Sequence, residues 1–336
     1  MVQGKSIEVV AGAIRSDEGQ ILICLRPAHL EHGNLWELPG GKRKEGESRF
    51  RALRREVNEE LGIEIISAVP LLRFAYRYPT KTIDFDVWEV SKWRGSARGC
   101  EGQKIAWVNS SELIHYAFPA ANRTVVTALG LPRFACAIPD LRVSPAQYLG
   151  SLEKWIDAGP CCVILNNQLV IGGYNKRVLT EIGRFLGRYD AKLIFELSRE
   201  QDAKGTNAID VKLLDSIRGH VDCDTLIGFS CSTSTELVQA EQAGAELLLI
   251  GPFRSNGFET LNDTFGWSAV QDLVNNTVLP AFTFGSFLEP QDIARAILSG
   301  CQGVVLPFEV WTADKETAMD TLGKAVSEIE VADGNF

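Results

Sequence analysis

Three glutamates of this sequence have a spacing that could bind a divalent metal ion. Glu56, Glu59 and Glu60 stand at positions i, i+3 and i+4. On a helix their carboxylates would crowd one face, where like charges repel unless a cation binds between them. Carboxylate oxygens are hard ligands that suit Mg²⁺, with Mn²⁺ as an alternative, and such ions bridge protein carboxylates to substrate phosphates. The spacing therefore predicts a magnesium site.

These glutamates belong to a longer motif that begins at Gly41. The sequence runs Gly41-x5-Glu47-x7-Arg55-Glu56-Val57-x-Glu59-Glu60-x-Gly62-Ile63. This pattern matches every fixed position of the Nudix box, so the chain resembles the Nudix hydrolases. A solvated helix with i,i+4 charge pairs is the alternative, but it leaves the repulsion between the glutamates unexplained.

The residues beside the glutamates could support the same site. The Gly40-Gly41 turn lets the backbone approach closely and offers a carbonyl oxygen to the metal. Arg55 adjoins Glu56 and could orient a carboxylate through a charge-assisted hydrogen bond.

The resemblance extends over residues 5–129, which look like a MutT-type Nudix hydrolase, the class that removes 8-oxo-dGTP from the nucleotide pool. Residues 9–14 resemble the first strand of that family, and Cys24-Leu25-Arg26 resembles its phosphate-contacting arm. Residues 35–42 resemble its approach to the box, and residues 118–122 match its late Pro-x-Asn segment. The resemblance implies a role in mutation avoidance, and so in DNA repair and replication.

Carried over residue by residue, the resemblance implies a site. The expected metal-binding residues are the Gly40 carbonyl, Glu56, Glu59, Glu60 and Glu101. The four glutamates are also the expected catalytic residues, with Glu101 as the remote loop carboxylate that positions or deprotonates water. The expected substrate-binding residues are Arg26, Glu37, Leu38, Pro39, Gly40 and Asn122.

Several of these residues have a simpler alternative role. An asparagine amide can read a purine edge in two hydrogen bonds, but Asn122 could instead cap a helix that begins at Arg123. Arg26 could be an ordinary surface cation, and Glu101 an ordinary loop carboxylate. We expect Trp36 in the core, and we assign no role to His29 or His32.

The implied reaction is attack by water at phosphorus, with divalent ions neutralising the phosphates. The leading substrate is 8-oxo-dGTP, cleaved to 8-oxo-dGMP and pyrophosphate. One alternative is another nucleoside diphosphate derivative, such as ADP-ribose, or a different damaged nucleotide. Another is a fusion whose second half senses or makes a thiamine phosphate.

The elements that must position these residues can be predicted from hydrophobic spacing. Residues 47–61 have helical periodicity, and Gly62 ends the helix. Residues 7–15 and 20–25 are expected as a hairpin through Asp17-Glu18-Gly19. Further strands are expected at residues 71–78, 83–88 and 105–108, and short helices at 111–117 and 123–129. We therefore expect an α+β Nudix fold, with a mixed sheet and a central helix, in a domain of residues 1–130.

After Gly130-Leu131-Pro132 the pattern alternates between strands and helices. Strands are expected at residues 134–138, 161–165, 192–196, 226–230, 246–250, 281–284 and 303–306, with a weaker one at 208–211. Helices are expected at residues 145–158, 235–243 and 290–298. This alternation predicts parallel strands with right-handed crossovers, and the strand number favours a (β/α)8 TIM-barrel-like domain of residues 131–336.

This second half resembles thiamine-phosphate synthase and its TenI relatives at residues 227–230, 240–245 and 250–253. It departs from them at residues 165–168, where the basic diphosphate-binding segment is missing, after Gly251-Pro252, where the lysine is missing, and at Phe284-Gly285-Ser286. We therefore expect a degenerate barrel that binds a small phosphorylated ligand, such as a thiamine precursor, or serves as a scaffold. Ser230 is its one candidate polar site residue, and true synthase activity is the alternative.

Charge and cysteine content limit the partners and the compartment. The net charge of −9 argues against direct binding of duplex nucleic acid. This acidity lies in residues 133–336, which carry −11, whereas residues 1–132 carry +2. Eight cysteines without a CxxC pair, and no apolar N-terminal segment, predict reduced thiols in the cytoplasm. No apolar run is long enough to span a membrane.

Overall fold

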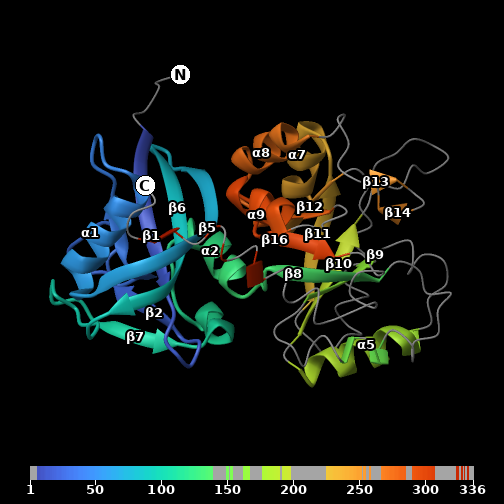
Figure 1. Ribbon diagram of the computed structural model, residues 1–336, viewed down its shortest axis with the longest axis horizontal. Coiled ribbons are helices and arrows are strands. Elements are labelled where there is room, and N and C mark those ends of the chain that lie inside the picture. Colours follow the sequence, from blue (N-terminus) through green and yellow to red (C-terminus); the bar gives the residue numbers. More distant parts are fainter. Residues whose placement is uncertain are drawn as a thin grey trace. The chain divides into compact units, whose positions relative to one another are not determined.

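The computed structural model describes residues 6–138 without a break. In the rest of the chain it describes residues 149–150, 152–153, 162–166, 176–189, 191–197, 225–251, 253–254, 257–258, 266–284, 290–306, 323–324, 327, 329 and 331–332. The chain divides into two compact units (Figure 1). The first comprises Met1–Gly130, Val274–Pro280 and Val326–Phe336, and the second comprises Leu131–Leu273 and Ala281–Ala325.

Helix α1 (Arg49–Leu61) carries the three glutamates of the motif. It begins two residues later than the periodicity predicts because the Ser48 hydroxyl caps it by accepting from the Arg51 amide. It ends at Gly62, whose φ of 68° is the left-handed conformation that glycine adopts without strain. The helix buries five residues, Phe50, Ala52, Leu53, Val57 and Leu61. This apolar face leaves the glutamates on the remaining surface of the helix.

The first unit contains two sheets. The five-stranded sheet has the order β17-β5-β6-β1-β4, formed by Val331–Ala332, Glu64–Arg77, Thr82–Arg94, Ser6–Ile14 and Gly40–Lys42. It is mixed, because β1 pairs in parallel with β6 and antiparallel with β4. The three-stranded sheet has the order β3-β2-β7, formed by Trp36–Glu37, Ile21–Leu25 and Ile105–Val108. The α+β Nudix architecture that the sequence predicts is confirmed.

The expected hairpin between the first two strands is wrong. A tight turn does join them, with the Gly19 amide donating to the Ser16 carbonyl. Beyond a single bridge between Arg15 and Ile21, however, β1 and β2 lie in different sheets. Both edges of β2 are occupied by β3 and β7, so its backbone groups are already paired there.

Two apolar clusters pack on the sheets. One joins α1 to the large sheet and includes Leu53, Val57 and Val90. The other includes Ile23 and Leu72 and contains residues of the 3₁₀ helix η1 (Ser110–His115) and of α2 (Asn122–Leu129). Strands β5 and β6 are longer than predicted, since shifts of register in their pairing interrupt the alternation of apolar residues.

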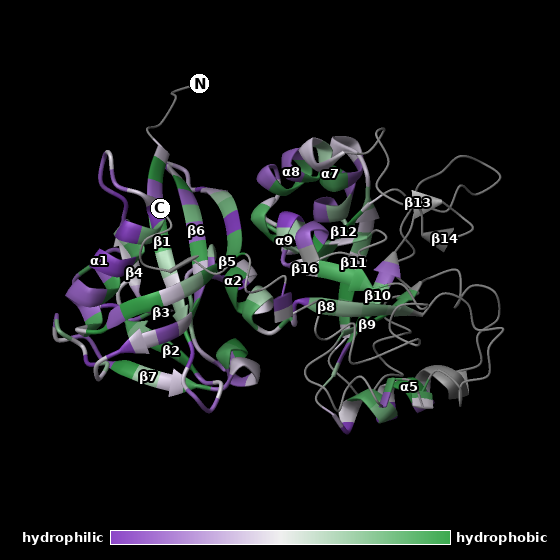
Figure 2. Ribbon diagram, in the orientation of Figure 1, coloured by the Kyte–Doolittle hydropathy of each residue, from purple (hydrophilic) through white to green (hydrophobic). Residues whose placement is uncertain are grey.

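The second unit contains a closed barrel of parallel strands, as the alternation predicts (Figures 1 and 2). In chain order its strands are β8 (Phe134–Ile138), β9 (Cys162–Asn166), β10 (Lys192–Leu197), β11 (Thr225–Cys231), β12 (Leu247–Ile250), β15 (Ala281–Phe284) and β16 (Gly303–Leu306). The ring closes where β16 pairs with β8. In this ring β10 pairs directly with β11. Residues 208–211, where a weaker strand is expected, lie outside the described residues.

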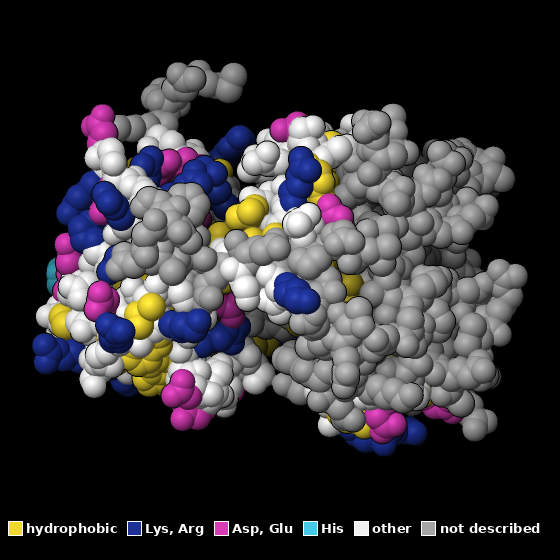
Figure 3. Space-filling view, in the orientation of Figure 1, with side chains coloured by type: hydrophobic (Ala, Val, Ile, Leu, Met, Phe, Trp, Pro, Cys, Tyr) yellow, Lys and Arg dark blue, Asp and Glu magenta, His cyan; other side chains and the backbone are white. Residues whose placement is uncertain are grey.

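Helices follow many of the barrel strands. The described ones are α5 (Lys176–Gly187), α7 (Ser234–Gln242), α8 (Trp267–Asn275) and α9 (Pro290–Leu298). Two short strands, β13 (Phe253–Arg254) and β14 (Gly257–Phe258), pair antiparallel with each other. The expected helix at residues 145–158 falls largely outside the described residues. No described helix has the length and apolarity needed to cross a membrane. In the first unit, Lys and Arg side chains are interspersed with Asp and Glu on the face shown in Figure 3.

Candidate active site

Gly40 and Gly41, which begin strand β4 and do not form the expected turn, bring two of the three glutamates together. The Gly40 amide donates to Oε2 of Glu60 at 3.0 Å. Gly40 has a φ of 151°, and a Cβ there would overlap the Val10 carbonyl, so only glycine fits. A Cβ on Gly41 would overlap the carboxylate of Glu56. Gly40 therefore lies against Glu60, and Gly41 lies against Glu56.

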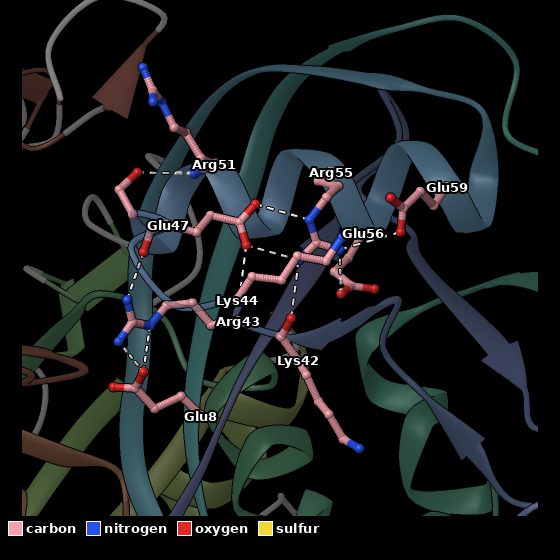
Figure 4. Close-up of polar contacts among 10 residues, drawn as sticks. Glu8, Lys42, Arg43, Lys44, Glu47, Arg51, Arg55, Glu56 and Glu59 are labelled. Atoms are coloured by element: carbon pink, nitrogen blue, oxygen red, sulfur yellow. Dashed lines mark hydrogen bonds and ion pairs between the residues drawn. The ribbon is translucent and has the colours of Figure 1, made fainter.

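Arg55 holds the carboxylates of the motif from one side (Figure 4). Its Nε and Nη2 donate to the two oxygens of Glu47, each at 2.9 Å. Its Nη1 donates to Glu56 at 2.6 Å and to Glu59 at 3.3 Å. This two-pronged hydrogen bonding lowers the pKa of Glu47 to about 2 and raises the pKa of Arg55. Arg55 thus orients carboxylates as its place in the motif suggests.

Glu60 is the most perturbed acid of the site. Its pKa is raised to about 8, chiefly by burial, and the Gly40 amide only partly opposes this shift. Repulsion from three further carboxylates adds to it: Glu37, Glu101 and Glu56. Glu56 of the motif, Glu37 of β3 and Glu101 of the loop at residues 98–103 therefore all lie near the half-buried carboxylate of Glu60.

The chemistry of this donor set fits a divalent cation. Among the described residues no three His, Cys, Asp or Glu side chains are close enough, as they stand, to hold an ion, because Glu56 and Glu59 turn toward Arg55. The available donors are nevertheless carboxylate and carbonyl oxygens, which Mg²⁺ and Mn²⁺ prefer. A cation would also relieve the repulsion that raises the pKa of Glu60. The residues present therefore fit a metal site.

Glu101 lies on an exposed loop that docks against the end of α1. The Cys100 amide donates to the Glu60 carbonyl at 2.8 Å, and the Arg98 amide donates to the Leu61 carbonyl at 3.1 Å. These two backbone hydrogen bonds hold the loop against the end of α1, although Glu101 is far from the motif in sequence.

Arg26 is not a free surface cation. Its Nη1 donates to Oε2 of Glu37 at 2.6 Å, and its Nε donates to the Glu31 carbonyl at 3.0 Å. Burial raises the pKa of Glu37, and Arg26 opposes that rise. Leu38 is buried, and the Pro39 carbonyl accepts from the Gly12 amide of β1 at 2.9 Å. These contacts fix the segment that connects β3 to Gly40 and Gly41 of β4.

Asn122 is the first residue of α2 and is partly exposed. The N-cap position is occupied by Ala121, without a side-chain hydrogen bond. The alternative that Asn122 caps a helix starting at Arg123 is therefore wrong, because the helix begins one residue earlier.

Trp36 of β3 contacts the segment between η1 and α2. Its amide donates to the Ala117 carbonyl at 2.8 Å, and its ring packs edge-on against Tyr116. Trp36 is only partly buried and packs against an apolar cluster from its edge, so it lies at the margin of the core and not within it.

Sequence patterns did not indicate several contacts near the site. Lys81, in the turn between β5 and β6, donates to the Glu31 carboxylate at 2.7 Å. His32 has a φ of 61° and lies 5.7 Å, between ring centroids, from Tyr78. The partners in these contacts lie more than 40 residues apart, so no local spacing could have predicted them.

In the barrel, Ser230 donates a hydrogen bond to the carboxylate of Glu196. Both side chains are buried, at the carboxyl ends of β11 and β10. Glu196 follows Ile194 of the interior cluster by two residues, so it lies on the inward face of its strand. Ligand sites of such barrels lie at this end. A carboxylate here agrees with the loss of basic residues noted in the sequence.

Comparison with known proteins finds one family in the N-terminal part of the chain and a different family in the C-terminal part. The chain matches the NUDIX domain family over residues 10–128 and the thiamine monophosphate synthase family over residues 206–307. An 8-oxo-dGTP diphosphatase of Haemophilus influenzae is 40% identical over 125 residues, which are 37% of this chain and 92% of that protein. A CTP pyrophosphohydrolase of Escherichia coli is 35% identical over 124 residues, 37% of this chain and 91% of that protein. A solved thiamine phosphate pyrophosphorylase from Pyrococcus furiosus is 18% identical, with a TM-score of 0.43, over 62% of this chain and 98% of that one.

The motif, the fold around it and the match to nearly the whole length of these hydrolases lead to one conclusion. The chain belongs to the Nudix hydrolase family through its N-terminal domain, to which a thiamine monophosphate synthase-like barrel is fused.

Proposed function

We propose that the N-terminal domain hydrolyses 8-oxo-dGTP to 8-oxo-dGMP and pyrophosphate in a Mg²⁺-dependent reaction. The observation that carries this proposal is the convergence of carboxylates on Glu60, beside Gly40 and Gly41 of β4. The 8-oxo-dGTP diphosphatase at 40% identity supports the choice of substrate. Removal of this oxidised nucleotide would protect DNA replication from mutation.

The metal would be held by Glu56, Glu59, Glu60, Glu101 and the Gly40 carbonyl. When bound, a divalent ion neutralises phosphate charge and activates water. Arg55 keeps the carboxylates of Glu56 and Glu59 in a defined orientation. Arg26, held by Glu37, retains N–H donors that can contact a substrate phosphate.

Recognition of the base is assigned to Asn122 with the backbone of Glu37, Leu38 and Pro39. The Asn122 amide offers both a donor and an acceptor, and it is not used as a helix cap. 8-Oxoguanine carries a proton on N7 where guanine has a lone pair, so a matching acceptor would favour the oxidised base.

A second candidate is hydrolysis of another nucleotide. The CTP pyrophosphohydrolase is 35% identical over almost the same length of chain, so relatedness alone does not select the base. The test is a turnover screen of the whole protein against 8-oxo-dGTP, dGTP, CTP and ADP-ribose, with and without Mg²⁺, scoring monophosphate and pyrophosphate separately. Faster turnover of CTP or ADP-ribose than of 8-oxo-dGTP would favour this candidate.

For the barrel we propose a degenerate ligand-binding domain in place of a working synthase. The buried Glu196 carboxylate at the end of β10 disfavours capture of a diphosphate. Calorimetry of the full chain with thiazole phosphate and with thiamine phosphate tests for a retained thiamine-related ligand. Release of heat with neither compound would leave a scaffold role.

We also propose that the protein acts in the cytoplasm. The described cysteines Cys24, Cys100, Cys136, Cys162, Cys231 and Cys301 are free thiols, as expected in a reducing compartment. Localisation of a tagged chain by fractionation would check this assignment.

A further inference from the structure

The side chain of Gln103 connects the end of α1 to the loop that carries Glu101. Its Nε2 donates to the Glu60 carbonyl at 2.9 Å. Its Oε1 accepts from the backbone amide of Glu101, also at 2.9 Å. One amide group therefore uses its donor on the helix and its acceptor on the loop.

The loop is otherwise held by backbone contacts. The Glu60 carbonyl accepts from the Cys100 amide as well as from Gln103. The Gly102 amide donates to the Gly99 carbonyl at 3.2 Å, and a Cβ on Gly99 would overlap the Gln103 carbonyl. The loop thus folds tightly on itself, and the Gln103 amide is the group that fixes the backbone of Glu101 directly.

We propose that Gln103 is a positioning residue that holds Glu101 in place beside the carboxylates of α1. This inference rests on the proposed function, in which Glu101 completes the metal site. The Glu101 side chain is exposed, so little packing limits its motion. The position of the Glu101 carboxylate relative to α1 then depends on where the Glu101 backbone is held. Gln103 connects that backbone to the backbone of Glu60.

The role requires a glutamine. The side chain must donate to a carbonyl and accept from an amide at once, which a carboxylate or an ammonium cannot do. Gln103→Glu keeps the length and the acceptor, loses the donor to the Glu60 carbonyl and adds a negative charge. Gln103→Ala removes both contacts.

The test compares these variants with a matched control in the full chain. Asn58 also donates a side-chain amide to a carbonyl at the end of α1, that of Ile63, at 3.1 Å, and this hydrogen bond does not involve the loop of Glu101. Asn58→Ala therefore removes a similar hydrogen bond and should lower thermal stability alone. Binding of Mn²⁺ without nucleotide, followed by electron paramagnetic resonance, and kcat and KM for 8-oxo-dGTP are measured for each variant.

We expect Gln103→Ala and Gln103→Glu to weaken Mn²⁺ binding or lower kcat by about 10- to 100-fold, the usual effect of losing a residue that orients a metal ligand. KM should change less. In a background of Glu101→Gln, Gln103→Ala should have little further effect, because the group that it positions is already disabled.

Equal losses from Gln103→Ala with and without Glu101→Gln, or Mn²⁺ binding and kcat as high as in Asn58→Ala, would overturn the inference. A wild-type chain that binds Mn²⁺ but hydrolyses no nucleotide would contradict the proposed function, and the Mn²⁺ measurements would still decide the role of Gln103.

Discussion

Each of the two domains holds a glutamate at the place where a ligand would be expected, half-buried for Glu60 and buried for Glu196, and the surroundings of the two acids differ. Glu60 lies among other carboxylates and accepts a hydrogen bond from the Gly40 amide at the start of β4. Glu196 lies two residues beyond Ile194 of the apolar barrel cluster and accepts a hydrogen bond from Ser230. A buried acid suggests metal chemistry when further oxygen donors converge on it. A carboxylate at the carboxyl end of a barrel strand, where ligands of such barrels bind, suggests a site that disfavours anions.

The largest contrast is expected when each glutamate is neutralised. Glu60→Gln should lower turnover of 8-oxo-dGTP by orders of magnitude while the fold remains, because a metal ligand is lost. Glu196→Gln should leave turnover unchanged, because its strand belongs to the other domain. Steady-state kinetics with Mg²⁺ and circular dichroism of both variants check this. Substantial activity in Glu60→Gln would remove Glu60 from the metal site.

A smaller loss of turnover is expected from adding a methyl group at Gly41 of β4. In Gly41→Ala the new methyl group would overlap the Glu56 carboxylate, so kcat should fall by roughly 10- to 100-fold as that ligand moves. Gly46→Ala is the control, since a Cβ there meets nothing within 4 Å and only the positive φ of 76° is strained. It should cost about 1 kcal/mol of stability and leave kcat unchanged. Equal kinetics in the two variants would mean that Gly41 does not shape the site.

Selectivity should depend on Asn122. Loss of a two-point hydrogen bond to a base costs about 1–3 kcal/mol, so Asn122→Ala should lower the preference for 8-oxo-dGTP over dGTP roughly 10-fold. The ratio of kcat/KM for the two nucleotides measures this preference. An unchanged ratio would show that another group reads the oxidised base.

The smallest effect is a dependence of stability on pH. The pKa of Glu60 is raised to about 8 from an ordinary 4.5, so between these values the folded chain holds a proton that the unfolded chain has lost. Without metal, the free energy of unfolding should therefore fall as pH rises through this interval. Mg²⁺ binds the ionised carboxylate, so its apparent affinity should weaken as pH falls below about 8. Thermal unfolding at several pH values, with EDTA and with Mg²⁺, tests both trends, and Glu60→Gln should remove this contribution.

The parts of the site that one element carries could be predicted from the sequence. The helical period put Glu56, Glu59 and Glu60 on α1, and Gly62 ended the helix where expected. The first two strands were misjudged because pairing partners for β2 come from β3 and β7, which no local turn signal reveals. Bulges likewise concealed the full length of β5 and β6.

Contacts between distant segments could not be predicted. The ion pair between Arg26 and Glu37 depends on which strands become neighbours, and so does the buried hydrogen bond between Ser230 and Glu196. The final strand β17, which pairs with β5 at Ser67 and Ala68, joins the first unit from the far end of the chain. Each of these contacts follows from the sheet order, which a single sequence does not display.

The most direct test of the account is to identify the products of the full chain acting on 8-oxo-dGTP with Mg²⁺. Phosphorus NMR distinguishes the two ways of cleaving the triphosphate. We predict 8-oxo-dGMP and pyrophosphate in equal amounts, with the reaction abolished by EDTA and by Glu60→Gln. Release of single phosphate, or turnover that is unaffected by both treatments, would contradict the account.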